Sequence, residues 1–170
     1  MKRWIVGMAC AVTFLAAIEV GSVPPPVTLQ GEEGGKADGT PWHSSMLKGK
    51  VHVLFYVDPD EKDLNEAFAD ALHEKHYDAK RFGTVAVVNL AATWKPDAII
   101  EMLLKKKQKQ YPRTVYVKDK HKTLVKRWQL ADDNSDVLIF GKDGKLLYQH
   151  FGKMDKKEID KALGIIESHL

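Results

Sequence analysis

The chain has 170 residues, of which 44% are apolar and 29% charged, and its formal net charge is +3. These values are typical of one globular domain, and they exclude an intrinsically disordered chain, a repeat array and a multidomain enzyme. The net charge is too small to dictate the kind of partner.

Residues 1–22 are predicted to be a signal peptide. Two basic residues follow Met1, and residues 4–18 form an apolar run. A cut before Val23 would follow residues that are small or are accepted at a cleavage site. A retained anchor and a lipid on Cys10 are the alternatives. The run is shorter than the ~20 residues that span a bilayer, and no Leu-like residue stands three positions before Cys10. We therefore expect a periplasmic protein with no stable membrane span after signal removal.

Cysteine usage restricts the chemistry of the mature chain. Cys10 is the only cysteine of the sequence. Removal of the signal peptide would leave residues 23–170 without a thiol. Disulfides, thiolate nucleophiles and cysteine metal ligands would then be impossible.

The first half of the mature chain predicts an arm followed by a strand and a helix. Prolines and glycines in residues 23–45 indicate an extended N-terminal arm. Residues 51–57 are rich in β-branched and aromatic residues, which is typical of a buried strand. From Asp60 the apolar residues recur at helical spacing, and an acidic first turn would suit the positive end of the helix dipole.

The next segment predicts a strand and a helix. Residues 84–90 favour a second buried strand. Pro96 suits the first turn of a helix. This helix carries an apolar face formed by Ala98, Ile99, Met102 and Leu103.

The last segment predicts more strands and a final helix. Residues 114–117 and 124–128 are expected to be short strands joined by a charged turn. Residues 137–140 and 146–149 flank a Lys-Asp-Gly turn, which indicates a hairpin. Apolar residues at helical spacing near the C-terminus indicate a helix. The order of elements predicts an α/β fold with a central mixed β-sheet and helices on both faces.

Several segments carry a family resemblance. Val53-Leu54-Phe55-Tyr56 and Phe140-Gly141-Lys142-Asp143-Gly144-Lys145 resemble exported thioredoxin-like proteins. Val88-Asn89, Tyr111-Pro112, Trp128-Gln129-Leu130 and Ser135-Asp136-Val137-Leu138-Ile139 look like the YtfJ family of periplasmic thioredoxin-fold proteins. The resemblance implies a thioredoxin-like domain over residues 23–170, and it identifies a fold more firmly than an activity.

The sequence departs from the redox pattern of that fold. If Phe55-Tyr56 is placed on the Phe-Trp before a redox motif, Asp60 and Asp63 stand where the two cysteines would be. Ser135 stands where the substrate-gripping cis-proline would be. A carboxylate cannot exchange disulfides, so we expect no thiol–disulfide activity.

Two groups of residues are candidate metal ligands. Asp58, Asp60 and Asp63 would give calcium three oxygen ligands at a strand-to-helix turn. His73 and His76 share a helical face. An acidic first turn has an ordinary structural role, and the histidines lack a visible third ligand. We therefore predict no metal site, no cofactor and no catalytic residue.

Basic residues concentrate between Lys105 and Arg127. This segment holds eight lysines and two arginines against one acidic residue, Asp119, a local charge of +9. It could bind lipid head groups or anionic glycans, or it could be a solvated helix end. Nucleic acid is excluded as a partner because export removes the protein from the genome. The residues of this candidate polyanion patch are Lys105, Lys106, Lys107, Lys109 and Arg113.

Two classes of function remain open. The first is a non-catalytic binding or adaptor module that holds an envelope protein or an anionic envelope component. Its candidate partner-binding surface consists of Asp58, Asp60, Asp63 and Ser135. The alternative is an uncharacterised enzyme or metal-binding protein that uses the same carboxylates. The first is favoured because no set of nucleophile, base and orienting group is recognisable.

Overall fold

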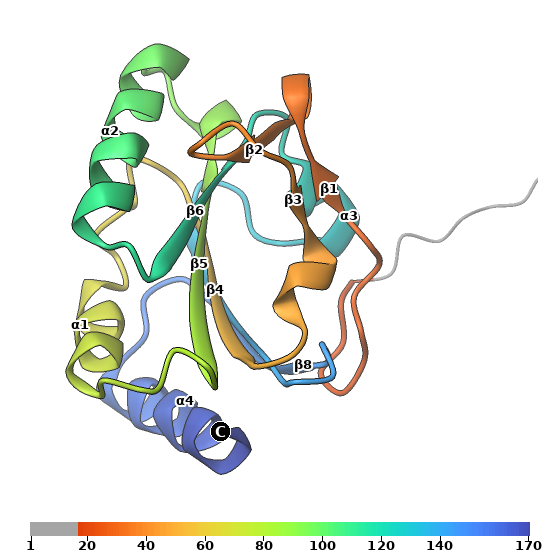
Figure 1. Cartoon of the computed structure of the whole chain (residues 1–170), viewed down its shortest axis with the longest axis vertical. Helices are drawn as coiled ribbons and strands as arrows, with labels where there is room; N and C mark the ends of the chain where they lie inside the picture. Colours follow the sequence, from red (N-terminus) through yellow and green to blue (C-terminus); the bar gives the residue numbers. More distant parts are fainter. Residues whose placement is uncertain (1–16) are drawn as a thin grey trace, which may run out of the picture.

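A six-stranded mixed sheet forms the centre of the computed structural model, which describes residues 17–170 (Figure 1). Three central strands run parallel to one another, and the outer strands are antiparallel to their neighbours. This confirms the predicted α/β class with a mixed sheet. In spatial order the strands are β2 (Gly34–Lys36), β6 (Thr114–Asp119), β5 (Phe82–Asn89), β4 (Val51–Val57), β7 (Ser135–Phe140) and β8 (Leu146–Phe151).

The central strand β4 is buried on both faces, as its apolar composition predicts. Residues 51–56 are all buried, and β5 and β7 flank the strand. Strand β5 begins at Phe82, two residues before the predicted start. The predicted hairpin is formed by β7 and β8, and Gly144 adopts the positive φ of 81° that its turn requires.

The helices cover both faces of the sheet, as predicted. One face carries α1 (Glu66–Glu74), α2 (Asp97–Gln110) and α4 (Lys156–His169); the other carries α3 (Thr123–Trp128) (Figure 1). Helix α4 confirms the predicted C-terminal helix and begins with a reciprocal capping box of Asp155 and Glu158. Within residues 17–170, no helix is long and apolar enough to cross a membrane.

The segment around residues 124–128 was predicted to be a strand, and this is wrong. It lies in helix α3, whose first turn is capped by the buried carboxylate of Asp119. That carboxylate accepts the N–H groups of Thr123 at 2.8 Å and Leu124 at 2.9 Å. Leu124 and Trp128, four residues apart, share the buried face of the helix.

The predicted start of the first helix is also wrong. Helix α1 begins at Glu66, and the acidic residues from Asp60 to Asp63 lie in turns before it. The carboxylate of Asp58 accepts the Asp60 N–H at 2.9 Å, which stabilises a turn directly after β4. These carboxylates therefore do not form the first turn of a helix.

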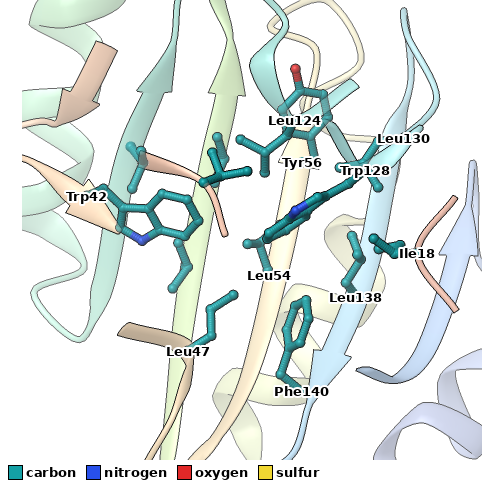
Figure 2. Close-up of a cluster of buried hydrophobic side chains, with 14 of the residues drawn as sticks. Ile18, Trp42, Leu47, Leu54, Tyr56, Leu124, Trp128, Leu130, Leu138 and Phe140 are labelled. Carbon is teal, nitrogen blue, oxygen red and sulfur yellow. The ribbon is translucent and has the colours of Figure 1, made fainter. Parts of the chain in front are cut away.

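The predicted N-terminal arm is packed against the domain. It contributes the antiparallel pair β1 (Thr28–Leu29) and β3 (Trp42–His43), and the sheet-edge strand β2. Gly34 permits this edge pairing, because a Cβ there would lie 2.0 Å from the Lys118 carbonyl oxygen. Trp42 is fully buried in the core beneath the β1–β3 pair (Figure 2). Gly34 thus serves close packing of this arm.

A second tryptophan joins the N-terminal segment to the core. The Trp128 ring lies among Leu54, Leu138 and Phe140 (Figure 2), and its Nε1 donates to the Pro25 carbonyl oxygen at 2.8 Å. Ile18 belongs to the same cluster and is 4% exposed. The predicted signal peptide lies mostly outside the described residues, which begin at position 17.

Candidate functional site

Polar and charged side chains gather where the parallel strands β4, β5 and β6 end. Loops at the carboxyl ends of parallel strands are a common position for binding sites in open α/β sheets. We call this group the carboxyl-edge cluster. It consists of Asp58, Asp60, Asn89, Lys95, Lys122, Asp132 and Asp133.

Asp60 connects two loops of the carboxyl-edge cluster. Its carboxylate forms an ion pair with Lys95 and accepts the Thr93 hydroxyl at 3.0 Å. These bonds, first from Lys95 and then from Thr93, lower the pKa of Asp60. The loop after β4 is therefore held against the loop that precedes α2.

Asp58 is the buried carboxylate of the cluster, with 4% of its surface exposed. Its backbone N–H donates to the Asn134 carbonyl oxygen at 2.8 Å, which places it beside the loop before β7. Burial raises the pKa of Asp58, and the negative charges of Asp133 and Asp60 raise it further. A cation that reached this carboxylate would relieve that repulsion.

Asp132 is held from two other elements. Asn89 Nδ2, at the end of β5, donates to its Oδ1 at 3.0 Å, and Lys122 forms an ion pair with it. Burial alone would raise the pKa of Asp132, but the bonds from Lys122 and Asn89 outweigh burial and lower it. Asn89 Oδ1 is buried and has no partner among residues 17–170.

The charges of the carboxyl-edge cluster do not balance. Four carboxylates face two lysines, which leaves an excess of negative charge. The connection from β6 to β7 also holds three non-glycine residues with positive φ: Lys122, Gln129 and Asp133. Such backbone conformations cost free energy and concentrate at binding sites. The arrangement suits binding of a cationic group.

The structure brings together only part of the predicted partner-binding surface. Asp58 and Asp60 are neighbours in the cluster. Asp63 is exposed and pairs with the adjacent Lys62. Ser135 follows the cluster in sequence, but its side chain is 2% exposed and accepts a hydrogen bond from Asn65. Ser135 and Asp58 are thus both buried, and the exposed members of the predicted surface are Asp60 and Asp63.

Sequence reasoning missed Asn65, Asn89, Lys122, Asp132 and Asp133. Their side chains meet partners from other connections of the fold, and no local motif marks them. Asn65 was hidden within the helix that was predicted to start at Asp60. Only the polar character of Asp132-Asp133-Asn134 directly before β7 could have pointed to this edge.

The structure shows no metal centre among its described residues. No group of three or more histidine, cysteine, aspartate or glutamate side chains within residues 17–170 could hold a metal ion. The rings of His73 and His76 lie 5.9 Å apart, but His76 follows the end of α1. Asp58, Asp60 and Asp63 do not converge as calcium ligands.

The basic segment divides into two kinds of lysine. Lys118 and Lys120 form ion pairs with acidic residues of α2, and Lys122 pairs with Asp132. Lys105, Lys106 and Lys109, by contrast, have no ion pair within residues 17–170. Lys107 lies over the Tyr111 ring, and Arg113 donates to the Tyr77 carbonyl oxygen. Unpaired charge in this segment therefore lies at two places, the end of α2 and, with the exposed Lys126 and Arg127, the end of α3.

Solved structures share this fold. The pneumococcal exposed lipoprotein thioredoxin Etrx1 of Streptococcus pneumoniae strain TIGR4 matches with a TM-score of 0.58 and 18% identity, over 82% of this chain and 98% of that chain. The likeness shows that the fold is thioredoxin-like.

Sequence comparison identifies relatives that span the same length. The uncharacterised protein YtfJ of Escherichia coli (strain K12) is 24% identical over 185 residues, covering 99% of this chain and 98% of the relative. An uncharacterised protein of Haemophilus influenzae (strain ATCC 51907 / DSM 11121 / KW20 / Rd) is 23% identical over 184 residues, covering 98% and 97%. The family model described as a bacterial protein of unknown function, YtfJ_HI0045, matches residues 27–169, and the chain belongs to this family.

Proposed function

We propose that the protein is an exported, non-catalytic binding or adaptor module of the periplasm that holds a partner at the carboxyl-edge cluster. The observation that carries this proposal is the replacement of the redox motif. The turn after β4 holds Asp58 and Asp60, and Asp60 is fixed by Lys95 and Thr93. Residues 17–170 contain no cysteine. Thiol–disulfide exchange therefore has no nucleophile in this domain.

The charge of the cluster favours a basic partner. Lys or Arg side chains form their strongest hydrogen bonds with carboxylates, and the negative charges of Asp133 and Asp60 raise the pKa of the buried Asp58. Buried and repelling carboxylates are typical of binding sites. We infer that the partner is an envelope protein that presents a basic side chain to this edge of the sheet.

The absence of redox activity can be tested with a gain-of-function control. The wild type should not reduce insulin disulfides, and dithiothreitol should not change its stability. The variant Asp60→Cys/Asp63→Cys should gain thiol reactivity above that of Asp70→Cys/His73→Cys, which has the same spacing on the exposed face of α1. Turnover by the wild type would refute the proposal. Equal reactivity of both cysteine pairs would contradict the assignment of residues 60 and 63 to the redox position.

Export is part of this proposal, with the predicted cut before Val23, and residues 18–22 of the uncut chain contact the domain. Ile18 is 4% exposed in the core. The Gly21 N–H donates to the Leu146 carbonyl oxygen at 2.7 Å, and the Leu146 N–H donates to the Ser22 carbonyl oxygen at 2.9 Å. The predicted cut before Val23 would remove these contacts.

We expect an N-terminus near Val23 in the protein purified from its native host. Intact-mass analysis and N-terminal sequencing provide the measurement. A chain that begins at Ile18 would instead show that the contacts of residues 18–22 are kept in the mature protein. An unprocessed Met1 in the cytoplasm would overturn the export proposal, and a lipid on Cys10 would instead show a membrane anchor.

A further inference from the structure

Helix α2 exposes its apolar face to solvent. The sequence predicts an apolar stripe on this helix, and the structure directs its large members outward: Ile99 is 47% exposed, Met102 63% and Leu103 46%. Residues spaced by three and four positions are neighbours on a helix surface, so these side chains form one continuous strip. Contiguous exposed apolar surface commonly marks an interaction site.

The opposite side of α2 packs against the domain. Ile100 and Leu104 pack against Ala37 and Leu90. The two acidic residues of the helix are also engaged: Glu101 pairs with Lys118 at 3.0 Å, and Asp97 lies 3.5 Å from Lys120. Both acidic residues of α2 are therefore paired with lysines of β6 or of the loop that follows it.

Lysines extend the apolar strip toward the C-terminus of the helix. Lys106 follows Met102 and Leu103 by four and three positions, and Lys105 and Lys109 lie beside it. These three lysines are exposed and have no ion pair in the part of the chain that the structure describes. One face thus combines an apolar half with a cationic half.

Trp94 lies next to this helix and is 85% exposed. The residues on both sides of it are fixed, because Thr93 and Lys95 both bind the Asp60 carboxylate. The Lys95 N–H also donates to the Thr93 hydroxyl at 3.3 Å. The loop is therefore anchored while its indole remains in solvent. Tryptophan favours the interface between water and lipid.

We propose that this face, which we call the α2 face, docks the protein onto an anionic lipid surface. It consists of Trp94, Ile99, Met102, Leu103, Lys105, Lys106 and Lys109. The apolar side chains enter the boundary between head groups and acyl chains, and the lysines bind anionic head groups. A soluble polyanion would meet the lysines but leave the apolar strip in water. This inference is independent of partner binding at the carboxyl-edge cluster.

The test uses vesicles of equal parts phosphatidylglycerol and phosphatidylcholine, with pure phosphatidylcholine as the neutral reference. At low salt, the protein should float with the anionic vesicles, and its tryptophan emission should shift to the blue. The mature chain, which lacks Trp4, is used; Trp42 and Trp128 are 0% and 1% exposed, so a Trp94→Phe variant should lose this shift. All variants carry the same N-terminus as the wild type, which cancels any contribution of the leader.

Two variants separate the halves of the α2 face. Lys105→Gln/Lys106→Gln/Lys109→Gln should weaken anionic vesicle binding by about a hundredfold, since each lysine near such a surface contributes about fivefold. Trp94→Ser/Met102→Ser should weaken it by about tenfold or more through lost apolar burial. The matched control Lys153→Gln/Lys156→Gln/Lys157→Gln removes the same charge near the start of α4 and should retain most of the binding.

Four results would overturn the proposal. Binding to neutral vesicles as strong as to anionic ones would show that charge is irrelevant. Equal losses in the α2 variant and the α4 control would indicate attraction without a defined face. Binding of heparin without vesicle binding would assign the lysines to a soluble polyanion. Absence of any vesicle binding at low salt would show that the α2 face is not a lipid-docking surface.

Discussion

Replacing Asn65 by alanine should lower the free energy of unfolding by about 3 kcal/mol. Asn65 is 5% exposed and joins α1 to two distant parts of the sheet. Its Nδ2 donates to the carbonyl oxygen and the hydroxyl of Ser135, each at 3.1 Å, and to the Gly152 carbonyl oxygen at 3.0 Å. Its Oδ1 accepts the Met154 N–H at 2.9 Å. The variant would leave several buried polar groups without partners.

Urea denaturation of Asn65→Ala against the wild type measures this effect. Asp70→Ala, an exposed substitution on the same helix, is the control and should change stability by less than about 0.5 kcal/mol. A loss below about 1 kcal/mol for Asn65→Ala would show that water or a shifted backbone satisfies these groups in its place.

The stability of the protein should also depend on pH through Asp136. This carboxyl group is fully buried on β7, and its Oδ2 accepts the Ala131 N–H at 2.8 Å. Its Oδ1 has no partner within residues 17–170. Burial raises the pKa of Asp136 to about 7, against 3.8 for the ordinary group, and the Ala131 bond offsets only part of this effect.

The direction of the pH effect follows from proton binding. Between pH 3.8 and about 7 the folded chain keeps a proton on Asp136 that the unfolded chain loses. The Asp136 contribution to folding is therefore fully present below pH 3.8, and it is lost as pH rises through about 7. The full loss is on the order of 4 kcal/mol, at about 1.4 kcal/mol for each unit of pKa shift.

The buried His52 changes the free energy of unfolding with pH in the opposite direction over part of the same pH range. Burial lowers the pKa of His52 below 6.5, so its contribution is present above pH 6.5 and is lost as pH falls through the folded pKa. The difference in stability between the wild type and Asp136→Asn cancels the His52 contribution, because both proteins retain His52. The variant should match the wild type near pH 4 and exceed its stability by a few kcal/mol at pH 8.

Guanidinium denaturation between pH 4 and 8 measures the difference. Asp143→Asn, a substitution of an exposed carboxylate in the β7–β8 turn, should show no comparable gain at pH 8. If Asp136→Asn and the wild type differ by the same amount at both ends of the range, Asp136 is ionised throughout in the folded chain.

The sequence could predict the elements whose signals are local. The predominantly apolar sequence of β4 and the Lys-Asp-Gly turn of the last hairpin depend on neighbouring residues, and both are confirmed. Helix α3 was missed because its short apolar pattern suits either a strand or a helix. Its capping by the side chain of Asp119 decides between the two.

The candidate site could be predicted only in part, because only some of its residues lie in one segment of the sequence. The turn after β4 marks Asp58 and Asp60, because a single segment carries them. Lys95, Lys122 and Asp132 reach the same edge from other connections, and only the folded sheet brings them together. The sequence also could not show that the apolar face of α2 points outward. Ile100 and Leu104 form a second apolar stripe that fits the helical period equally well, and this second stripe is the buried one.

Site-specific photo-crosslinking in the native host tests partner binding at the carboxyl-edge cluster most directly. A photoreactive residue at the exposed position Glu61, beside Asp60, should yield one discrete conjugate with an envelope protein. Asp58→Asn should reduce that conjugate, Asp143→Asn should not, and a probe at Asp143 should not form it. No conjugate at Glu61, or the same conjugate from both probe positions, would contradict the account.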